Sequence, residues 1–430
     1  MSRTAEAVLV LAAAALAAFG VLLVNFARGV NLNADTPVTL LVFITVFGGL
    51  LAAVRSWAPR SVPFLIPLAA TLTAVGFVIL YRLDHHLAGV QRWWLLSNAG
   101  LAALWLFSVR TRGIRSLARH RYVLLAVAAV LASLPLIPAV EGLPVQGLPI
   151  NGSRLWVEWY WGVRIRFQSG EVARLLLVVF LASFLSEHQT ALSAAGRTAG
   201  RFRLPQPRGL LPAGVAWIAS LGILLYLRDL GASLLLAGVV LTMLYIATNR
   251  PSYLATGAGL VVTGVLVAYF VVGHVGDRID AWFDPWANLD GAGLQTVQGL
   301  FALAAGSLSG TGLGLGEPDL IPAATTGFVF AAAGEELGLA GSVVVLAAYA
   351  LLVATGFGIA LRARDLFRKL LAAGLSLTLG LQTLLVVAGV LRILPVTGMT
   401  APFMSAGGSS TVAGFLLLAL LARTSHEERT

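Results

Sequence analysis

Two pairs of carboxylates lie in a polar, glycine-rich segment of an otherwise apolar chain. Glu317 and Asp319 form one pair, and Glu335 and Glu336 form the other. Carboxylates can act as general bases, which take a proton from a hydroxyl that attacks another group. The same residue types also occur in solvated turns, or as partners of buried backbone and arginine groups. Both interpretations stay open from the residues alone.

Arginines interleaved with aromatic residues form a second candidate site. Residues 151–167 read NGSRLWVEWYWGVRIRF and contain three arginines, Arg154 and Arg166 among them. Guanidinium groups bind phosphate through paired hydrogen bonds, so the segment predicts a site for an anionic lipid headgroup. An interfacial belt of tryptophan and tyrosine is the alternative. Glu171 and Arg174 follow on a helix, where they either pair with each other or line a polar cavity.

The elements that must position these residues are membrane-spanning helices. The chain has 430 residues, of which 58% are hydrophobic and 11% charged, and its mean hydropathy is +0.88. This composition is typical of a polytopic membrane protein. The sequence contains no cysteine, which excludes disulfides and thiolate metal sites. The net charge of +10 comes from arginines in short loops, which indicates membrane orientation rather than nucleic-acid binding.

Twelve apolar segments approach the roughly 20 residues that a membrane-spanning helix needs. Arginine-rich loops near residues 110–121, 197–208 and 362–369 alternate with loops that are poorer in arginine. We therefore expect the rich loops and both termini to be cytoplasmic, and the long loops 139–169 and 275–327 to lie outside. The predicted spans are 7–27, 37–55, 63–81, 93–109, 122–138, 170–187, 209–227, 229–247, 252–274, 328–360, 370–391 and 402–422.

Several short motifs occur in a fixed order along the chain. Each alone is weakly specific, but together and in this order they resemble the SEDS family, the RodA/FtsW-like membrane glycosyltransferases of the cell wall. The resemblance covers residues 63–424. The matching segments are 151–156 (NGSRLW), 167–174 (FQSGEVAR), 228–233 (RDLGAS), 295–298 (QTVQ), 310–314 (GTGLG), 334–338 (GEELG), and PVTG with PFMSAGGSS within 395–410.

The resemblance implies an all-α polytopic membrane fold of about twelve transmembrane helices with a large extracytoplasmic loop. Residues 1–62 hold two helices outside the ten-helix SEDS core at 63–424, as in some RodA-like members. The large loop falls at 275–327, and residues 425–430 form a short cytoplasmic tail. The expected location is the bacterial cytoplasmic (inner) membrane, which the chain crosses many times, with both termini cytoplasmic.

The resemblance also implies a substrate and a partner. Family members polymerise lipid II, an undecaprenyl-pyrophosphate-linked precursor, usually in complex with a class B penicillin-binding protein that crosslinks the product. No cofactor is certain, although a divalent cation bound with the pyrophosphate fits the chemistry. The expected substrate-binding residues are Arg154, Arg166, Gln168, Glu171, Arg174, Asp229, Gln295, Gln298, Thr397, Ser405 and Ser409, with Arg228 or Arg392 as further cations for the pyrophosphate.

Several positions depart from the family pattern, and Gly327 is the one that bears most on chemistry. The family's HTDF or NTDF motif reads TTGF at residues 325–328, so Gly327 replaces the aspartate to which the family's general base is attributed. The tyrosine of the family's SYGGSS motif is replaced by Ala406. Glycine cannot transfer a proton, and loss of a general base typically costs ~10²–10⁴ in rate. The candidate substitutes are Asp319, Glu335 and Glu336.

Two function classes therefore remain open, and with them the question of whether the protein is an enzyme. One is a lipid II-handling glycosyltransferase of cell elongation, division or sporulation, with a moved base or low activity. The other is a non-catalytic scaffold or regulator that binds lipid-linked precursor or a penicillin-binding protein. A transporter of lipid-linked sugar is a weaker alternative, because few charges beyond Arg174, Arg228 and Asp229 could line a transport path.

Overall fold

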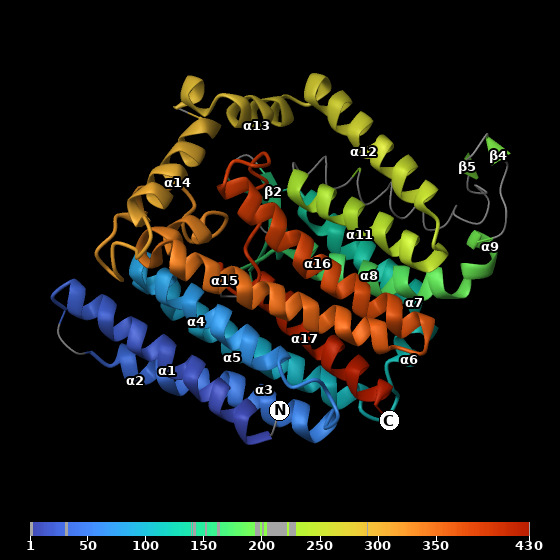
Figure 1. The fold of residues 1–430 in the computed structure, drawn as a ribbon, viewed down its shortest axis with the longest axis horizontal. Coiled ribbons are helices and arrows are strands. Elements are labelled where there is room, and N and C mark those ends of the chain that lie inside the picture. Colours follow the sequence, from blue (N-terminus) through green and yellow to red (C-terminus); the bar gives the residue numbers. More distant parts are fainter. Residues whose placement is uncertain are drawn as a thin grey trace. The chain divides into compact units, whose positions relative to one another are not determined.

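The structure is a computed structural model that shows a mainly helical chain (Figure 1). Two compact units can be distinguished: Met1–Thr111, Asp277–Thr355 and Gln382–Thr430 form one, and Arg112–Gly276 and Gly356–Leu381 form the other. The described residues are 3–30, 33–138, 140, 143–150, 153–160, 164–193, 198–199, 202–203, 222, 229–289 and 291–429.

Nine helical segments within the described residues are long and apolar enough to cross a membrane. They confirm the predicted all-α, polytopic membrane fold. The segments are α1 (Arg3–Ala27), the continuous segment Asp35–Trp57, α4 (Leu65–Leu83), α8 (Ser169–Glu187), α11 (Leu230–Thr248), α12 (Pro251–Val271), α15 (Val329–Arg362), α16 (Leu366–Val390) and α17 (Gly408–Glu428).

Two further predicted spans are also helical. Helix α5 (His85–Val109) contains the predicted span 93–109, and α7 (Arg121–Ser133) continues into the 3₁₀ turn η2 (Leu134–Leu136). The predicted span 209–227 lies outside the described residues, except for residue 222. The number twelve therefore stays a prediction.

Two helices begin at other residues than the predicted spans. Helix α5 begins earlier than expected, because the Asp84 side chain caps it by accepting a backbone N–H of the first turn at 2.9 Å. His85 is the first residue of this helix. Helix α17 begins later, at Gly408, because the preceding segment is not helical: φ is 66° at Phe403 and 152° at Gly407.

The N-terminal spans pack into the first unit. The second span consists of α2 (Asp35–Phe43), a π-helical turn η1 (Ile44–Gly48) and α3 (Gly49–Trp57). Figure 1 shows α1 beside α4, and the chain also contacts α5 through α3. Edge-on aromatic pairs join this span to the core, with ring centroids 5.5 Å apart for Phe43 and Phe77 and 5.7 Å for Phe47 and Phe415.

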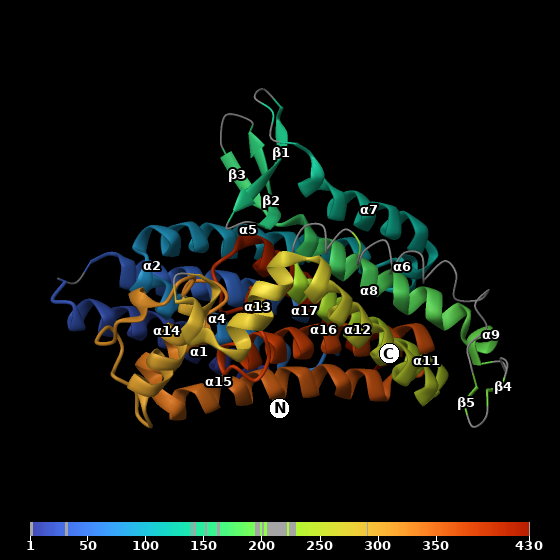
Figure 2. The same ribbon diagram turned by 90° about the horizontal axis from the view of Figure 1, so that it is seen from above.

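The expected external loop 139–169 contains a sheet in the second unit. Strands β1 (Val145–Ile150), β2 (Ser153–Tyr160) and β3 (Arg164–Phe167) form an antiparallel sheet in the order β1-β2-β3 (Figure 2). The alternation of polar with aromatic and branched residues in this segment favours strands. The other short elements of this unit are α6 (Arg115–Arg119), α9 (Gln189–Ser193), and the paired strands β4 (Thr198–Ala199) and β5 (Phe202–Arg203).

The expected large loop 275–327 is itself mostly folded. It contains most of α13 (Gly273–Phe283), the 3₁₀ turn η3 (Pro285–Asn288), helix α14 (Ala292–Gly306) and the 3₁₀ turn η4 (Pro318–Leu320). The Asp284 side chain caps η3 by accepting two backbone N–H bonds. The segment can therefore hold side chains at fixed positions around residue 327.

Candidate functional site

The segment before α15, which contains Gly327, is held from one side by α14. Gln295 donates from its side-chain Nε2 to the Pro322 carbonyl at 3.0 Å. One helical turn later, a Cβ added to Gly299 would lie 2.6 Å from the Phe328 ring, so only glycine lets this buried ring pack so closely on α14. Gln295 therefore positions the segment through its backbone.

The loop that precedes α17 also holds this segment. The Ser405 hydroxyl donates to the Thr326 carbonyl at 2.6 Å and accepts from the Ala401 N–H at 2.7 Å. The backbone N–H of Ala406 donates to the Thr325 carbonyl at 2.8 Å. The predicted site residue Ser405 thus orders the backbone around Gly327, and the contact at Ala406 needs no tyrosine side chain.

Gly327 itself is half-buried and is not required by the backbone. Its φ does not lie in the left-handed region that favours glycine. A Cβ added there would have the Met399 carbonyl oxygen as its nearest neighbour, at 3.5 Å, which is an ordinary van der Waals contact. The structure therefore has room for a side chain at the position where the family has its aspartate.

Arg278, on α13, lies beside the same turn and was missed in the sequence. Its Nη1 donates to the carbonyls of Val396 at 3.2 Å and Thr397 at 2.8 Å. A Cβ built on Gly398 would lie 3.4 Å from the Arg278 Nη2, and the Gly398 Cα lies 3.9 Å from a Cβ built on Gly327. A cation therefore lies near the position that lacks the carboxylate. The only signal in the sequence was an arginine in a loop expected to be poor in arginine.

Two of the candidate substitute bases are bound by one buried arginine. Arg82 Nε lies 3.0 Å from Glu336 Oε1, and its Nη1 lies 3.0 Å from Asp319 Oδ2. The Arg82 Nη2 also donates a hydrogen bond to the Gly316 carbonyl at 2.7 Å. The side chains of Arg82 and Glu336 are 3% and 0% exposed, so their charges compensate each other inside the protein.

The third candidate, Glu335, is hydrogen-bonded to a backbone N–H group. Its Oε1 accepts the N–H of Glu317 at 2.7 Å. Glu335 follows Gly327 by more than two helical turns, which at ~1.5 Å per residue is roughly 12 Å along the helix. Since Glu336 is the next residue, and Asp319 shares Arg82 with it, the three carboxylates form a cluster at the other end of this helical segment.

This cluster lies where the two glycine motifs meet. The N–H groups of Thr311 and Gly312 donate to the carbonyls of Glu335 and Glu336, at 2.9 Å and 3.1 Å. Helix α15 is kinked at Gly338, where φ is 68° and ψ is −171°. A Cβ at Gly338 would lie 2.2 Å from a backbone nitrogen of the neighbouring motif. The GTGLG and GEELG motifs therefore fold the segment by direct backbone packing.

The arginine-rich face of the sheet carries an ion pair, and its three arginines, Arg154, Arg164 and Arg166, are all exposed. Arg166 Nε lies 3.3 Å from Glu158 Oε1, and Gln146 also donates to Glu158, at 3.2 Å. Glu158 is buried although it lies on this face. Residues alternate between the faces of a strand, so Arg154 shares the face of Glu158 and Arg166. The Arg154 side chain is exposed.

The other predicted site residues of the second unit lie at helix starts. Glu171 and Arg174 form an ion pair at 2.5 Å, which is the local pairing that the sequence left open. Gln168 is the N-cap residue of α8. Asp229 is the N-cap of α11, where its side chain accepts the Ala232 N–H at 2.9 Å. Arg228 lies outside the described residues.

The remaining predicted residues belong to the first unit. Thr397 and Ser409 are buried, and Gln298 is half-buried on α14. The guanidinium of Arg392 donates to the Trp282 and Phe283 carbonyls at 2.9 Å and 2.6 Å, so it holds the end of α13. No group of three His, Cys, Asp or Glu residues in the described part of the chain is placed to hold a metal ion.

Comparison with known proteins identifies the family. A family model described as "Cell cycle protein", for FtsW, RodA and SpoVE, matches residues 60–430. The chain belongs to this family. This membership confirms the resemblance found in the motifs. The chain is also similar to peptidoglycan glycosyltransferase RodA of Mycobacterium tuberculosis (strain H37Rv), with 39% identity over 99% of this chain and 91% of that protein. Stage V sporulation protein E of Bacillus subtilis (strain 168) is 29% identical over 85% of this chain and 97% of its own.

Solved structures of family members share the fold. A chain from a study of structural coordination of polymerization and crosslinking by a peptidoglycan synthase complex matches with a TM-score of 0.66 and 27% identity, over 86% of this chain and 98% of that one. Rod shape determining protein RodA of Thermus thermophilus matches with a TM-score of 0.56 and 27% identity, over 86% of this chain and 98% of its own.

Proposed function

We propose that this protein works in peptidoglycan biogenesis in the bacterial cytoplasmic membrane, where it binds lipid II and polymerises it weakly or not at all. Its family and its curated relatives support a role in making cell wall. A polymerase must remove a proton from the attacking hydroxyl, and Gly327 has no group that can accept it.

One observation carries this proposal: the contacts that order the backbone around Gly327 are present, while the aspartate side chain that the family has at this position is missing. Ser405, Ala406 and Gln295 still order the backbone before α15, and Arg278 lies beside the turn. This arrangement suits an anionic, pyrophosphate-linked ligand, because a guanidinium can pair with phosphate. The structure therefore supports binding of lipid II better than it supports its polymerisation.

A moved base is less well supported than a missing one. Glu336 and Asp319 are paired with Arg82, and Glu335 holds the Glu317 N–H. Glu335 and Glu336 are buried, so these contacts hold their carboxylates in place, whereas Asp319 is exposed and also pairs with Arg82. The arrangement is typical of a structural cluster, which agrees with a protein that regulates or supports an active polymerase.

A class B penicillin-binding protein is the partner that we propose from the family resemblance. One solved relative comes from a peptidoglycan synthase complex, which supports an assembly of this kind in general. The proposed orientation has both termini in the cytoplasm and the segment around Gly327 outside, where lipid II is used. A divalent cation, if the reaction requires one, would enter with the pyrophosphate, and chelation with EDTA tests this.

The decisive experiment restores the carboxylate. Purified protein in detergent or nanodiscs is given lipid II, and glycan chains are separated by gel electrophoresis. We expect little product from the natural sequence and at least about tenfold more from Gly327→Asp, since a general base contributes ~10²–10⁴ in rate. The conformation and free space at Gly327 accept this change.

Gly327→Asn is the matched control, because it has the same shape without a basic carboxylate, and it should not raise the rate. Robust polymerisation by the natural sequence that is lost in Asp319→Ala would contradict the proposal and identify a moved base. Lipid II binding is measured separately on the same samples. Binding without polymerisation in every variant would favour the scaffold function.

A further inference from the structure

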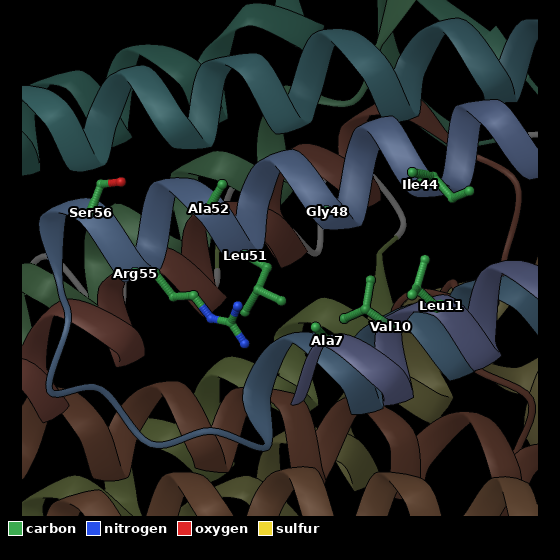
Figure 3. Close-up of a pocket in the computed structure, with 9 residues that line it drawn as sticks. All are labelled: Ala7, Val10, Leu11, Ile44, Gly48, Leu51, Ala52, Arg55 and Ser56. Atoms are coloured by element: carbon green, nitrogen blue, oxygen red, sulfur yellow. The ribbon is translucent and has the colours of Figure 1, made fainter. Parts of the chain in front are cut away.

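A groove between the two N-terminal spans has no part in the proposed function. It has a volume of about 460 Å³ and is lined by α1, by the π-helical turn η1 and by α3. Its walls are apolar except near one end, where Arg55 and Ser56 lie. Figure 3 shows Arg55 and Leu51 pointing from α3 toward the helix that contains Ala7 and Val10. Pockets that bind small ligands have volumes of ≈300–1,000 Å³, so the groove is large enough for a ligand.

The groove opens to the surface of the protein. Two of its lining residues, Leu11 and Ile44, are 51% and 37% exposed. From Ile44 to Arg55 the helix rises by roughly 16 Å, at ~1.5 Å per residue. Half of the ≈30 Å hydrocarbon core of a bilayer is about 15 Å. The groove therefore has about the length of an acyl chain in one leaflet, and Arg55 lies in the last turn of α3 at its polar end.

The polar end of the groove carries a positive charge. Arg55 Nη2 lies 3.3 Å from Glu6 Oε2, and the same guanidinium contacts the Arg3 carbonyl. Two guanidinium groups, on Arg3 and Arg55, oppose the single carboxylate of Glu6, which leaves one net positive charge. The Arg55 side chain is 30% exposed while that of Glu6 is 10% exposed. A phosphate can therefore approach the arginine from outside.

We propose that this groove binds one anionic glycerophospholipid, with an acyl chain along the wall formed by Leu11, Ile44 and Leu51 and the phosphate at Arg55. A hydrophobic groove that ends in a guanidinium suits a molecule with an apolar chain and an anionic headgroup. A transmembrane helix of a partner protein would cover the groove without an ionic contact to Arg55. This difference separates the two occupants experimentally.

The first test fills the groove. Gly48 and Gly49 are adjacent, and a Cβ added to either meets no atom within 4 Å, but only Gly48 lines the groove. Gly48→Leu should block the acyl chain, while Gly49→Leu is the matched control. Bound phosphatidylglycerol is counted by native mass spectrometry of the full-length protein. We expect about tenfold less retention in Gly48→Leu and no change in Gly49→Leu.

The second test changes the headgroup end. Glu6→Gln frees Arg55 and should increase phosphatidylglycerol retention over phosphatidylcholine. The double change Glu6→Gln with Arg55→Gln removes both charges without leaving a buried carboxylate unpaired, and should lower the preference about tenfold, as expected when a charge-assisted bond is lost. The inference is overturned if Gly48→Leu retains as much phosphatidylglycerol as Gly49→Leu, or if retention shows no preference for the anionic lipid in the unchanged protein.

Discussion

At the scale of single residues, charge pairing decides which groups are available for chemistry. Arg82 contacts Glu336 and Asp319, and it also donates to the Gly316 carbonyl. Through these contacts the buried Arg82 holds the segment before α15 in place. The carboxylates that looked catalytic in the sequence thus act on the shape of the site, while the position of the missing base is a glycine with no side chain to accept a proton.

Removal of Arg82 should destabilise the protein strongly. Arg82→Met leaves Glu336, with 0% exposure, without its cation, and breaking a buried pair costs about 3–5 kcal/mol. Asp319→Asn should cost about 0–1 kcal/mol, because the Asp319 side chain is 52% exposed. Unfolding of the purified proteins in detergent, followed by circular dichroism, measures both. The double change Arg82→Met with Glu336→Leu should recover much of the loss, and equal stability of Arg82→Met and the unchanged protein would refute the structural role.

Two arginines should contribute to binding of the lipid-linked precursor. Arg154 is an exposed cation on the sheet, and Arg278 lies beside the turn of Gly327. Each change to alanine should weaken lipid II binding by ~1.5–3 kcal/mol, as for a charge-assisted hydrogen bond. Fluorescent lipid II titrated into nanodiscs measures the affinity. Arg112→Ala, at an exposed position in a predicted cytoplasmic loop, is the control and should bind normally. Equal affinities for all three proteins would contradict the prediction for each arginine.

At the scale of elements, glycines let two backbone segments touch. Gly310 and Gly338 both have positive φ, 83° and 68°, and an added Cβ would come within 2.2 Å of backbone atoms at either position. Such contacts cannot relax by moving a side chain. The kink of α15 and the glycine-rich loop therefore form one structure, which orients the helix start next to Gly327.

Gly338→Ala should disrupt this structure. The change adds steric overlap to a left-handed φ, so we expect a clear drop in thermal stability and, in a Gly327→Asp background, loss of the restored polymerisation. Gly358→Ala in the same helix is the control, since its Cβ would meet no atom within 4 Å. In a helix alanine is favoured over glycine by ≈0.8–1.0 kcal/mol, so this variant should be as stable or more stable. A Gly338→Ala protein with unchanged melting temperature would contradict the packing argument.

At the scale of the whole molecule, orientation in the membrane follows from arginine placement and is open to direct test. Positively charged loops remain in the cytoplasm, and the predicted cytoplasmic loops include Arg115. The chain has no cysteine, so an introduced cysteine is the single target of a thiol reagent. In intact cells, an impermeant maleimide should label Asn288→Cys and not Arg115→Cys. The reverse pattern would invert the proposed topology.

The sequence by itself determined the class of protein and its family. Hydropathy is a local property, because a span needs only about 20 consecutive apolar residues. Motifs such as GEELG and RDLGAS are also read directly from neighbouring residues. The departure at Gly327 was visible for the same reason, since a missing side chain is a matter of residue identity alone.

Only the tertiary structure decided which groups surround the site. Arg82 and Asp319 are 237 positions apart in sequence, and Arg278 reaches carbonyls 118 and 119 positions away. No local pattern encodes such pairings, because they depend on which helices pack together. The strands at residues 145–167 were missed because the segment was interpreted only as a loop between two spans, although its alternating residues favour strands. The space beside Gly327 was likewise invisible in the sequence, because it is formed by a loop that lies far along the chain.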